Sequence, residues 1–248
     1  IVPIIGKGQI PIVSKLMRLI GKNPIVLADL DSFADDLGLI NAFANDEQAD
    51  KAAQDKGHPS LVEFARSVHS DFCKAVEDYW QYIREDAERH LYWIKRDPDR
   101  DELTARRRST MAVLLNSDEQ KRLSWGNHEV WDSLFRRLVA LFDFLELAGC
   151  FILRKGTIEN YYQFSKVSTS SDKLSAAVNE VDGILQQERS FIERHYSDIL
   201  RALEFASKKS GIDEASALLD LLLAVIAPAL AKLKHDTSNT ELESITRQ

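Results

Sequence analysis

The apolar positions along the chain form two short runs before they settle into helical spacing. One run covers residues 1 to 5, and the other covers residues 25 to 28, after a proline. Runs of this length predict strands that are buried on both faces. Apolar residues between them recur every three to four positions from about residue 11, which predicts a helix and therefore a βαβ unit with parallel strands. The apolar face of that helix comprises Val13, Leu16, Met17 and Ile20.

The central part of the chain shows helical patterns throughout. Residues 33 to 58 are polar and predict short helices, and Ser60 starts a long helix that ends at the Asp-Pro-Asp of residues 97 to 99. A further helix is predicted from about Asn127, because apolar residues recur there at helical spacing. We therefore expect an all-helical insertion over residues 39–146.

The strand pattern returns after this insertion. Residues 150 to 153 form a short apolar run, and two amphipathic helices are predicted beyond it, the first marked by apolar residues from Leu174 to Leu203. The predicted fold is α/β, with a parallel sheet, flanking helices, the large helical insertion, and C-terminal helices over residues 171–248. The sheet core would consist of residues 1–38 and 147–170.

Composition narrows the class of protein. The 248 residues include only ten glycines and six prolines, which favours long helices over a turn-rich all-β design. The net charge of −7 argues against coating nucleic acid by bulk attraction, but it allows a local basic groove or an acidic site that reaches phosphate through metal ions. Cys73 and Cys150 match no metal-ligand spacing and predict buried free thiols in a reducing cytoplasm. Residues 215 to 231 are apolar but short for a bilayer span and contain Asp220 and Pro228, so no membrane partner is expected.

Candidate chemistry begins where the second predicted strand ends, at Asp29 and Asp31. In an extended strand this spacing points two side chains to the same side, and ligand sites in open parallel sheets collect at the carboxyl ends of strands. Two neighbouring carboxylates attract a cation, and hard divalent ions such as Mg2+ prefer oxygen ligands. The alternative is a strand end with two solvated turn acids.

Basic residues near this sheet edge are candidates for phosphate contacts. The Gly-Lys-Gly turn after the first predicted strand could hold a phosphate through its N–H groups and ammonium, or could be only a turn. The strand at residues 150 to 153 is followed by two cations, of which the second is Lys155. The arginine triplet at residues 106 to 108 indicates either a solvated helix face or a phosphate contact. The candidate phosphate-binding residues are Gly6, Lys7, Gly8 and Arg154.

Three segments carry a resemblance to a known family. They are Ile-Ile-Gly-Lys-Gly at residues 4–8, Leu-Ala-Asp-Leu-Asp-Ser at residues 27–32 and Leu-Arg-Lys-Gly-Thr-Ile-Glu-Asn-Tyr at residues 153–161. Together they resemble the Toprim domain of the OLD-family (overcoming lysogenization defect) nucleases, in the branch with a helical insertion. The motifs cover about residues 1–38 and 147–165, and the helical parts match only by length and placement.

This resemblance implies a Toprim-like fold and two-metal hydrolysis of DNA phosphodiesters, with Mg2+, Mn2+ or Ca2+ as the ions. It assigns Asp29 and Asp31 to metal ligands and Lys155 to a catalytic basic residue near the scissile phosphate. Glu159 would be a further metal ligand, with Glu146 as the alternative. The resemblance also implies an N-terminal ATPase domain in the same protein. ATP would act only through that domain, and that domain would form any homodimer. The family's glutamate after its first strand has no counterpart here. Either it lies upstream, as the strand at the very start of the chain leads us to expect, or the catalytic set is incomplete.

Two other functions remain open at this point. The first is a phosphotransferase of the haloacid-dehalogenase type, in which Asp29 would be the nucleophile, although Ser32 and Phe33 stand where those enzymes usually carry a Gly-Thr-type turn. The second is a non-catalytic DNA-binding or assembly module that has kept the Toprim fold.

Overall fold

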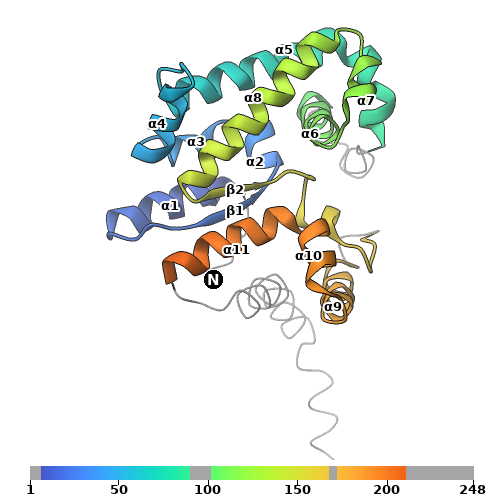
Figure 1. Cartoon of the computed structure of the whole chain (residues 1–248). Helices are drawn as coiled ribbons and strands as arrows, with labels where there is room; N and C mark the ends of the chain where they lie inside the picture. The colour runs from blue at the N-terminus through green and yellow to red at the C-terminus, as the bar shows by residue number, and fades with distance from the viewer. Residues whose placement is uncertain (1–6, 90–101, 168–171, 211–248) are drawn as a thin grey trace, which may run out of the picture. The chain divides into compact units, whose positions relative to one another are not determined.

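The computed structural model describes residues 7–89, 102–167 and 172–210, which fall into two compact units (Figure 1). One unit contains the described residues up to Asn160, and the other contains those from Tyr161 onward. The predicted strand at residues 1 to 5, Gly6, and the last predicted helix lie outside the described residues. The βαβ unit therefore stays a prediction, because its first strand lies outside the described residues.

The sheet of the first unit pairs two strands that are far apart in the sequence. Strand β1 (Val26–Asp29) lies parallel to strand β2 (Cys150–Leu153), and their register places Asp29 opposite Leu153. All four residues of β2 are buried, as its apolar run predicted. In β1 only Val26 and Ala28 are buried, so the prediction of burial on both faces is wrong for β1. Its alternating pattern is that of a strand with one less covered face.

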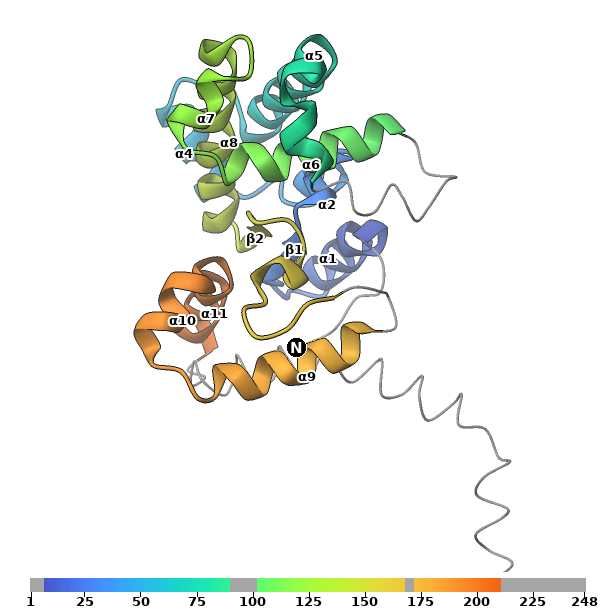
Figure 2. The same cartoon turned by 90° about the vertical axis from the view of Figure 1, so that its right-hand side faces the viewer.

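Helices make up most of the described residues of this unit, and they are the only regular elements described between the two strands, as the helical patterns predicted. The long helix α5 packs against α6 and α8 (Figures 1 and 2). The described chain is thus α/β in composition, with helices predominating over a small parallel sheet. The helices are η1 (Lys7–Gln9), α1 (Ile10–Leu19), α2 (Asp31–Ala34), α3 (Gly38–Asn41), α4 (Glu47–Asp55), α5 (Leu61–Glu88), α6 (Glu102–Leu115), α7 (Glu119–Leu123) and α8 (His128–Leu147).

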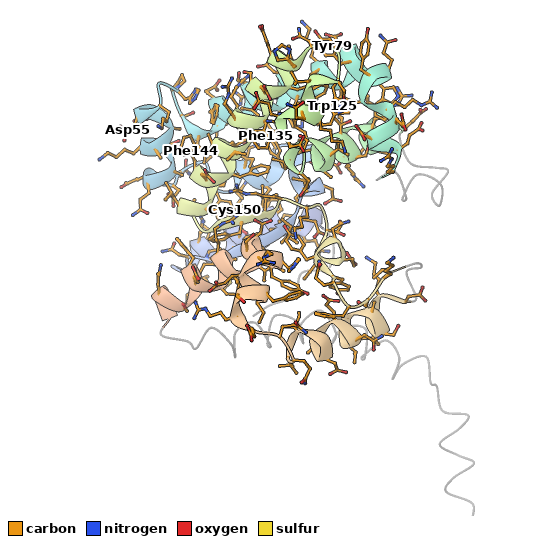
Figure 3. The ribbon with its side chains drawn as sticks, turned by 45° about the vertical axis from the view of Figure 1, so that its right-hand side comes forward. Asp55, Tyr79, Trp125, Phe135, Phe144 and Cys150 are labelled. Atoms are coloured by element: carbon orange, nitrogen blue, oxygen red, sulfur yellow. The ribbon has the colours of Figure 1, made fainter. Side chains whose placement is uncertain are left out.

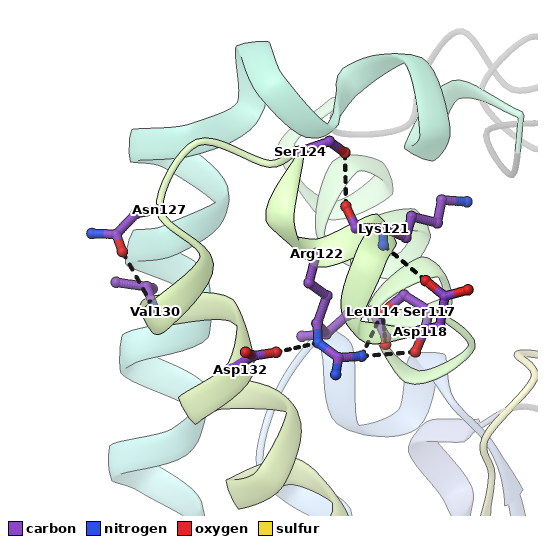
Figure 4. Close-up of polar contacts among 9 residues, drawn as sticks. All are labelled: Leu114, Ser117, Asp118, Lys121, Arg122, Ser124, Asn127, Val130 and Asp132. Carbon is purple, nitrogen blue, oxygen red and sulfur yellow. Dashed lines mark hydrogen bonds and ion pairs between the residues drawn. The ribbon is translucent and has the colours of Figure 1, made fainter.

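Side-chain caps fix where several of these helices begin. The Ser60 hydroxyl accepts a hydrogen bond from the Glu63 amide (3.2 Å) at the start of α5, as the sequence predicted. Asn127 caps α8 in the same way, through the amide of Val130 (Figure 4). A cap of this kind typically stabilises a helix by about 1 kcal/mol, because it satisfies a backbone donor that has no partner within the helix.

A buried arginine joins α7 to α8. Arg122 is only 8 % exposed, and its guanidinium donates to the Asp132 carboxylate and to the Ser117 carbonyl oxygen (2.7 Å; Figure 4). It also lies over the Phe135 ring, 4.4 Å from the ring centre. The buried charge is therefore paired with a carboxylate and hydrogen-bonded, which is the condition for burying an arginine.

The hydrophobic core of this unit lies between the helices and extends to both strands. Trp125 and Trp131 are completely buried in it, and Phe144 and Cys150 also belong to it; Figure 3 shows Trp125 among the helices and Cys150 at the sheet. Helix α1 departs from this pattern, because Leu16 and Ile20 on its predicted apolar face are exposed. Its buried residue is Ser14 instead.

The second unit contains three described helices where the pattern predicted one. The apolar repeat between Leu174 and Leu203 is divided among α9 (Lys173–Ile184), α10 (Arg189–His195) and α11 (Ser197–Ser210). The breaks leave helical spacing only slightly disturbed, which is why the periodicity did not reveal them. No helix in the described parts of either unit is both long and apolar enough to cross a membrane.

Candidate functional site

The carboxyl ends of the two parallel strands form the candidate site. Because Asp29 pairs with Leu153, the acidic end of β1 and the Arg154–Lys155 pair after β2 leave the sheet at the same edge. The backbone amide of Leu30 donates to the Gly156 carbonyl oxygen (2.8 Å). The segments that follow β1 and β2 are therefore still joined by a hydrogen bond just beyond the strands. Asp29 and Lys155, both half-buried, are thus brought to one edge from positions far apart in the sequence.

Asp31 reaches this edge by a different geometry from the one predicted. The strand ends at Asp29, Leu30 adopts a helical conformation (φ −58°, ψ −30°), and Asp31 is the first residue of α2. The period of two that governs side chains in a strand therefore does not apply to Asp31, and that part of the sequence argument is wrong. The next residue, Ser32, has a buried hydroxyl without a hydrogen-bond partner among the described residues.

The strongest electrostatic contact at the site comes from an arginine of the predicted triplet. Arg108 on α6 donates through Nε to Asp35 Oδ1 (2.6 Å) and through Nη2 to Asp35 Oδ2. Its Nη1 lies 3.7 Å from Asp31 Oδ2. Arg108 is therefore neither a solvated helix residue nor an open phosphate contact. Sequence reasoning had named Asp31 and the arginine triplet, but it had not predicted that Arg108 pairs with Asp35 and lies beside Asp31.

Arg154 is held by carboxylates at the end of α8. Its Nη2 donates to Asp143 Oδ1 (2.6 Å) and to Glu146 Oε1 (2.8 Å). The side-chain amide of Asn116 (Nδ2) also donates to the Arg154 carbonyl oxygen (3.1 Å), which fixes the backbone at this point. A phosphate at Arg154 would compete with two carboxylates. Glu146, the alternative metal ligand, is likewise engaged in this ion pair.

A tight turn carries Lys155 into the segment that contains Glu159. Gly156 adopts φ +124°, and the side chain of Asn160 accepts hydrogen bonds from the amide (2.7 Å) and hydroxyl (3.0 Å) of Thr157. Glu159 lies in the first turn of the short 3-10 helix η3 (Ile158–Tyr161). The turn thus fixes the path of the backbone between the two predicted site residues.

Other parts of the predicted site can be located only in part. Lys7 and Gly8 belong to η1, but Gly6 and the Lys7 side chain lie outside what the structure describes.

Within the described ranges, no group of three or more histidine, cysteine, aspartate or glutamate side chains is gathered as metal ligands. The donor set that remains at the strand end is a pair of aspartates, and Mg2+ is commonly held by one or two carboxylates together with water and phosphate oxygens. The pair suits such an ion, although a complete protein cage is not formed by the described residues.

A separate groove of about 420 Å³ lies between α5 and α8. None of the predicted site residues lines it. Its charged side chains are partly paired with one another, since Arg137 Nη1 donates to Asp71 Oδ2 (2.7 Å). Asp71 is therefore engaged with Arg137 at the rim of this groove.

Comparison with known proteins adds no neighbour to this picture. No protein-family model, no curated protein and no solved structure matches the chain.

Proposed function

We propose that the chain is the nuclease part of a larger ATPase–nuclease and hydrolyses DNA phosphodiesters with divalent metal ions. The observation that carries this proposal is the parallel pairing of β1 with β2, with Asp29 opposite Leu153. That register brings carboxylates and a lysine to one sheet edge, which is where open parallel sheets bind ligands. The resemblance of the same segments to the Toprim domain of OLD-family nucleases supplies the reaction and the substrate.

The roles of the side chains follow from their charges. Asp29 and Asp31 would hold Mg2+ or Mn2+, with Glu159 contributing to a second ion. A bound divalent ion lowers the pKa of a water molecule and stabilises the leaving oxygen. The Lys155 ammonium neutralises the negative charge that gathers on the phosphoryl oxygens, a role that suits a compact point charge. The ATPase partner and a cytoplasmic location belong to the same proposal.

A plasmid-nicking assay tests this function. The chain is incubated with supercoiled plasmid and Mg2+, Mn2+ or Ca2+, alongside Asp29→Asn, Asp31→Asn and Lys155→Met variants. We expect metal-dependent relaxation that falls at least about 100-fold in each variant, the usual scale for removing a group that stabilises transition-state charge. Asp78→Asn, in an exposed position on α5, is the matched control and should cut like the unchanged chain. Equal cutting by Asp29→Asn would refute the assignment.

Two observations favour the non-catalytic alternative. Asp31 already has a cationic neighbour in Arg108, and no three-ligand group is gathered in the described residues. A chain that binds DNA but never cuts it, even with its upstream residues and ATPase domain restored, would be the DNA-binding or assembly module instead.

A further inference from the structure

Arg108 places a permanent positive charge beside one of the two aspartates of the candidate metal site. The contact is well protected from solvent, because the side chains of Arg108, Asp31 and Asp35 are 20 %, 27 % and 15 % exposed. A guanidinium keeps its proton at every pH that a folded protein experiences. Asp31 therefore faces a cation in this structure, and that cation belongs to the protein.

The two contacts of this guanidinium differ in strength. Asp35 receives two hydrogen bonds in a fork, the geometry that binds a carboxylate most firmly. The same guanidinium lies 3.7 Å from Asp31, which is too long for a strong hydrogen bond. Asp35 therefore anchors Arg108, and the contact with Asp31 is the one that can yield.

The elements that carry these groups explain what such a contact would control. Asp31 and Asp35 belong to α2 and its end, directly after β1, whereas Arg108 belongs to α6 in the helical stretch between the strands. The positive charge reaches the strand end from a helix that is distant in sequence. Any displacement of α6 relative to α2 would change the electrostatic field at Asp31.

We propose that Arg108 is an internal counter-cation that competes with a divalent metal ion for Asp31. The proposal rests on the proposed function, since it takes Asp31 as a metal ligand. Arg108 acts through Asp31 and touches no reacting atom, so it is a positioning residue rather than a catalytic one. Metal loading weakens the Arg108–Asp31 contact, while Asp35 keeps the guanidinium nearby. The strand end is thereby held at low metal affinity as long as Arg108 keeps its contact with Asp31.

Mn2+ binding to the full chain, measured by isothermal titration calorimetry, tests this competition. Arg108→Gln should bind Mn2+ at least about tenfold more tightly than the unchanged chain. One unit charge roughly 6 Å from a divalent ion produces an effect of this size even at the dielectric constant of water. The matched control is Arg107→Gln on the same helix, since Arg107 pairs with Glu77 rather than with Asp31, and it should leave the affinity unchanged. Asp31→Asn should lose the binding.

Further variants separate charge from structure. Arg108→Lys keeps the charge but loses the fork, so its Mn2+ affinity should stay within about threefold of the unchanged chain even if its thermal unfolding temperature falls. Equal Mn2+ affinities for the unchanged chain and Arg108→Gln, with Asp31→Asn inactive in binding, would overturn the role of Arg108 and leave the metal site standing. So would a Lys variant that binds as tightly as the Gln variant. Absence of Mn2+ binding by the unchanged chain and by Arg108→Gln alike would instead remove the metal site, and with it the proposed function.

Discussion

Gly156 controls the turn that carries Lys155, and substituting it with alanine should destabilise the first unit. Its φ of +124° is a conformation that residues with a side chain rarely adopt, at a cost of about 1–3 kcal/mol. An added Cβ would also lie 2.7 Å from Asn160 Oδ1, so Asn160 would have to move. That movement breaks the hydrogen bond that Asn160 accepts from the Thr157 amide, which contributes about a further 0.5–1.5 kcal/mol of stability. We therefore expect Gly156→Ala to lower the free energy of unfolding by about 2–4 kcal/mol.

Tryptophan fluorescence during urea unfolding measures this change, because the three described tryptophans, Trp80, Trp125 and Trp131, all belong to the first unit. Gly57→Ala is the matched control. Gly57 also has a positive φ (+84°) but has open space around its Cβ position, so it should cost only about 1–2 kcal/mol. Asn160→Ala removes the clash, so the double variant should be less destabilised than the sum of the single changes. Equal losses for Gly156→Ala and Gly57→Ala, with strict additivity in the double variant, would refute this account of the turn.

Two further predictions concern buried titratable groups. Glu180 is completely buried and accepts hydrogen bonds from the backbone amides of Gln163 (2.6 Å) and Phe164 (2.9 Å) and from the Tyr196 hydroxyl. Glu180→Gln should therefore lower the free energy of unfolding by about 2–4 kcal/mol and speed hydrogen exchange of the amides at residues 163 and 164. Unchanged exchange would contradict this role. Burial lowers the pKa of His69 below its usual 6.5, against the opposing effect of its hydrogen bond with the Ala34 backbone. Since the folded state disfavours the protonated ring, stability should fall as the pH drops below 6.5 toward the pKa of the folded state, and His69→Leu should lack this part of the slope. A ring pKa at or above 6.5 in an NMR titration of the folded protein would show that reasoning to be mistaken.

The local elements were predictable from the sequence because their signals are local. The apolar run at Cys150–Leu153 gave the strand bounds directly. Ser60 and the apolar repeat that follows Asn127 marked helix starts. Each of these signals depends on residues within a few positions of one another, and so a single sequence contains them.

The errors arose where tertiary structure overrides a local pattern. Asp31 was assigned the geometry of a strand because nothing in its neighbours shows that the chain turns helical at Leu30. Helix α1 has an amphipathic pattern, yet two residues of its apolar face are exposed, because periodicity alone does not determine which face the rest of the protein covers. Where a helical repeat continues with small breaks, as between α9 and α11, its period alone does not locate them.

The candidate site was predictable as a set of residue types but not as a set of pairs. The sequence placed Asp29 and Lys155 at strand ends, and the pairing of β1 with β2 brings those ends to one edge. It also singled out the arginine triplet. However, Arg108 meets Asp35 across 73 positions, and the choice among many acidic partners depends on how α6 packs beside α2. No local signal encodes that choice.

Paramagnetic broadening by Mn2+ in an NMR spectrum of the deuterated, 15N-labelled chain is the most direct test of the central claim. Our account predicts that the first amide signals lost are those of residues 29–32 and 154–157, since they surround the carboxyl ends of β1 and β2. Amides around Asp46, which caps α4, and Asp50 on α4 serve as the internal control for acidic residues that are not a site. Early loss of the α4 signals, with the strand ends unaffected, would contradict a metal site at this edge and the nuclease proposed from it.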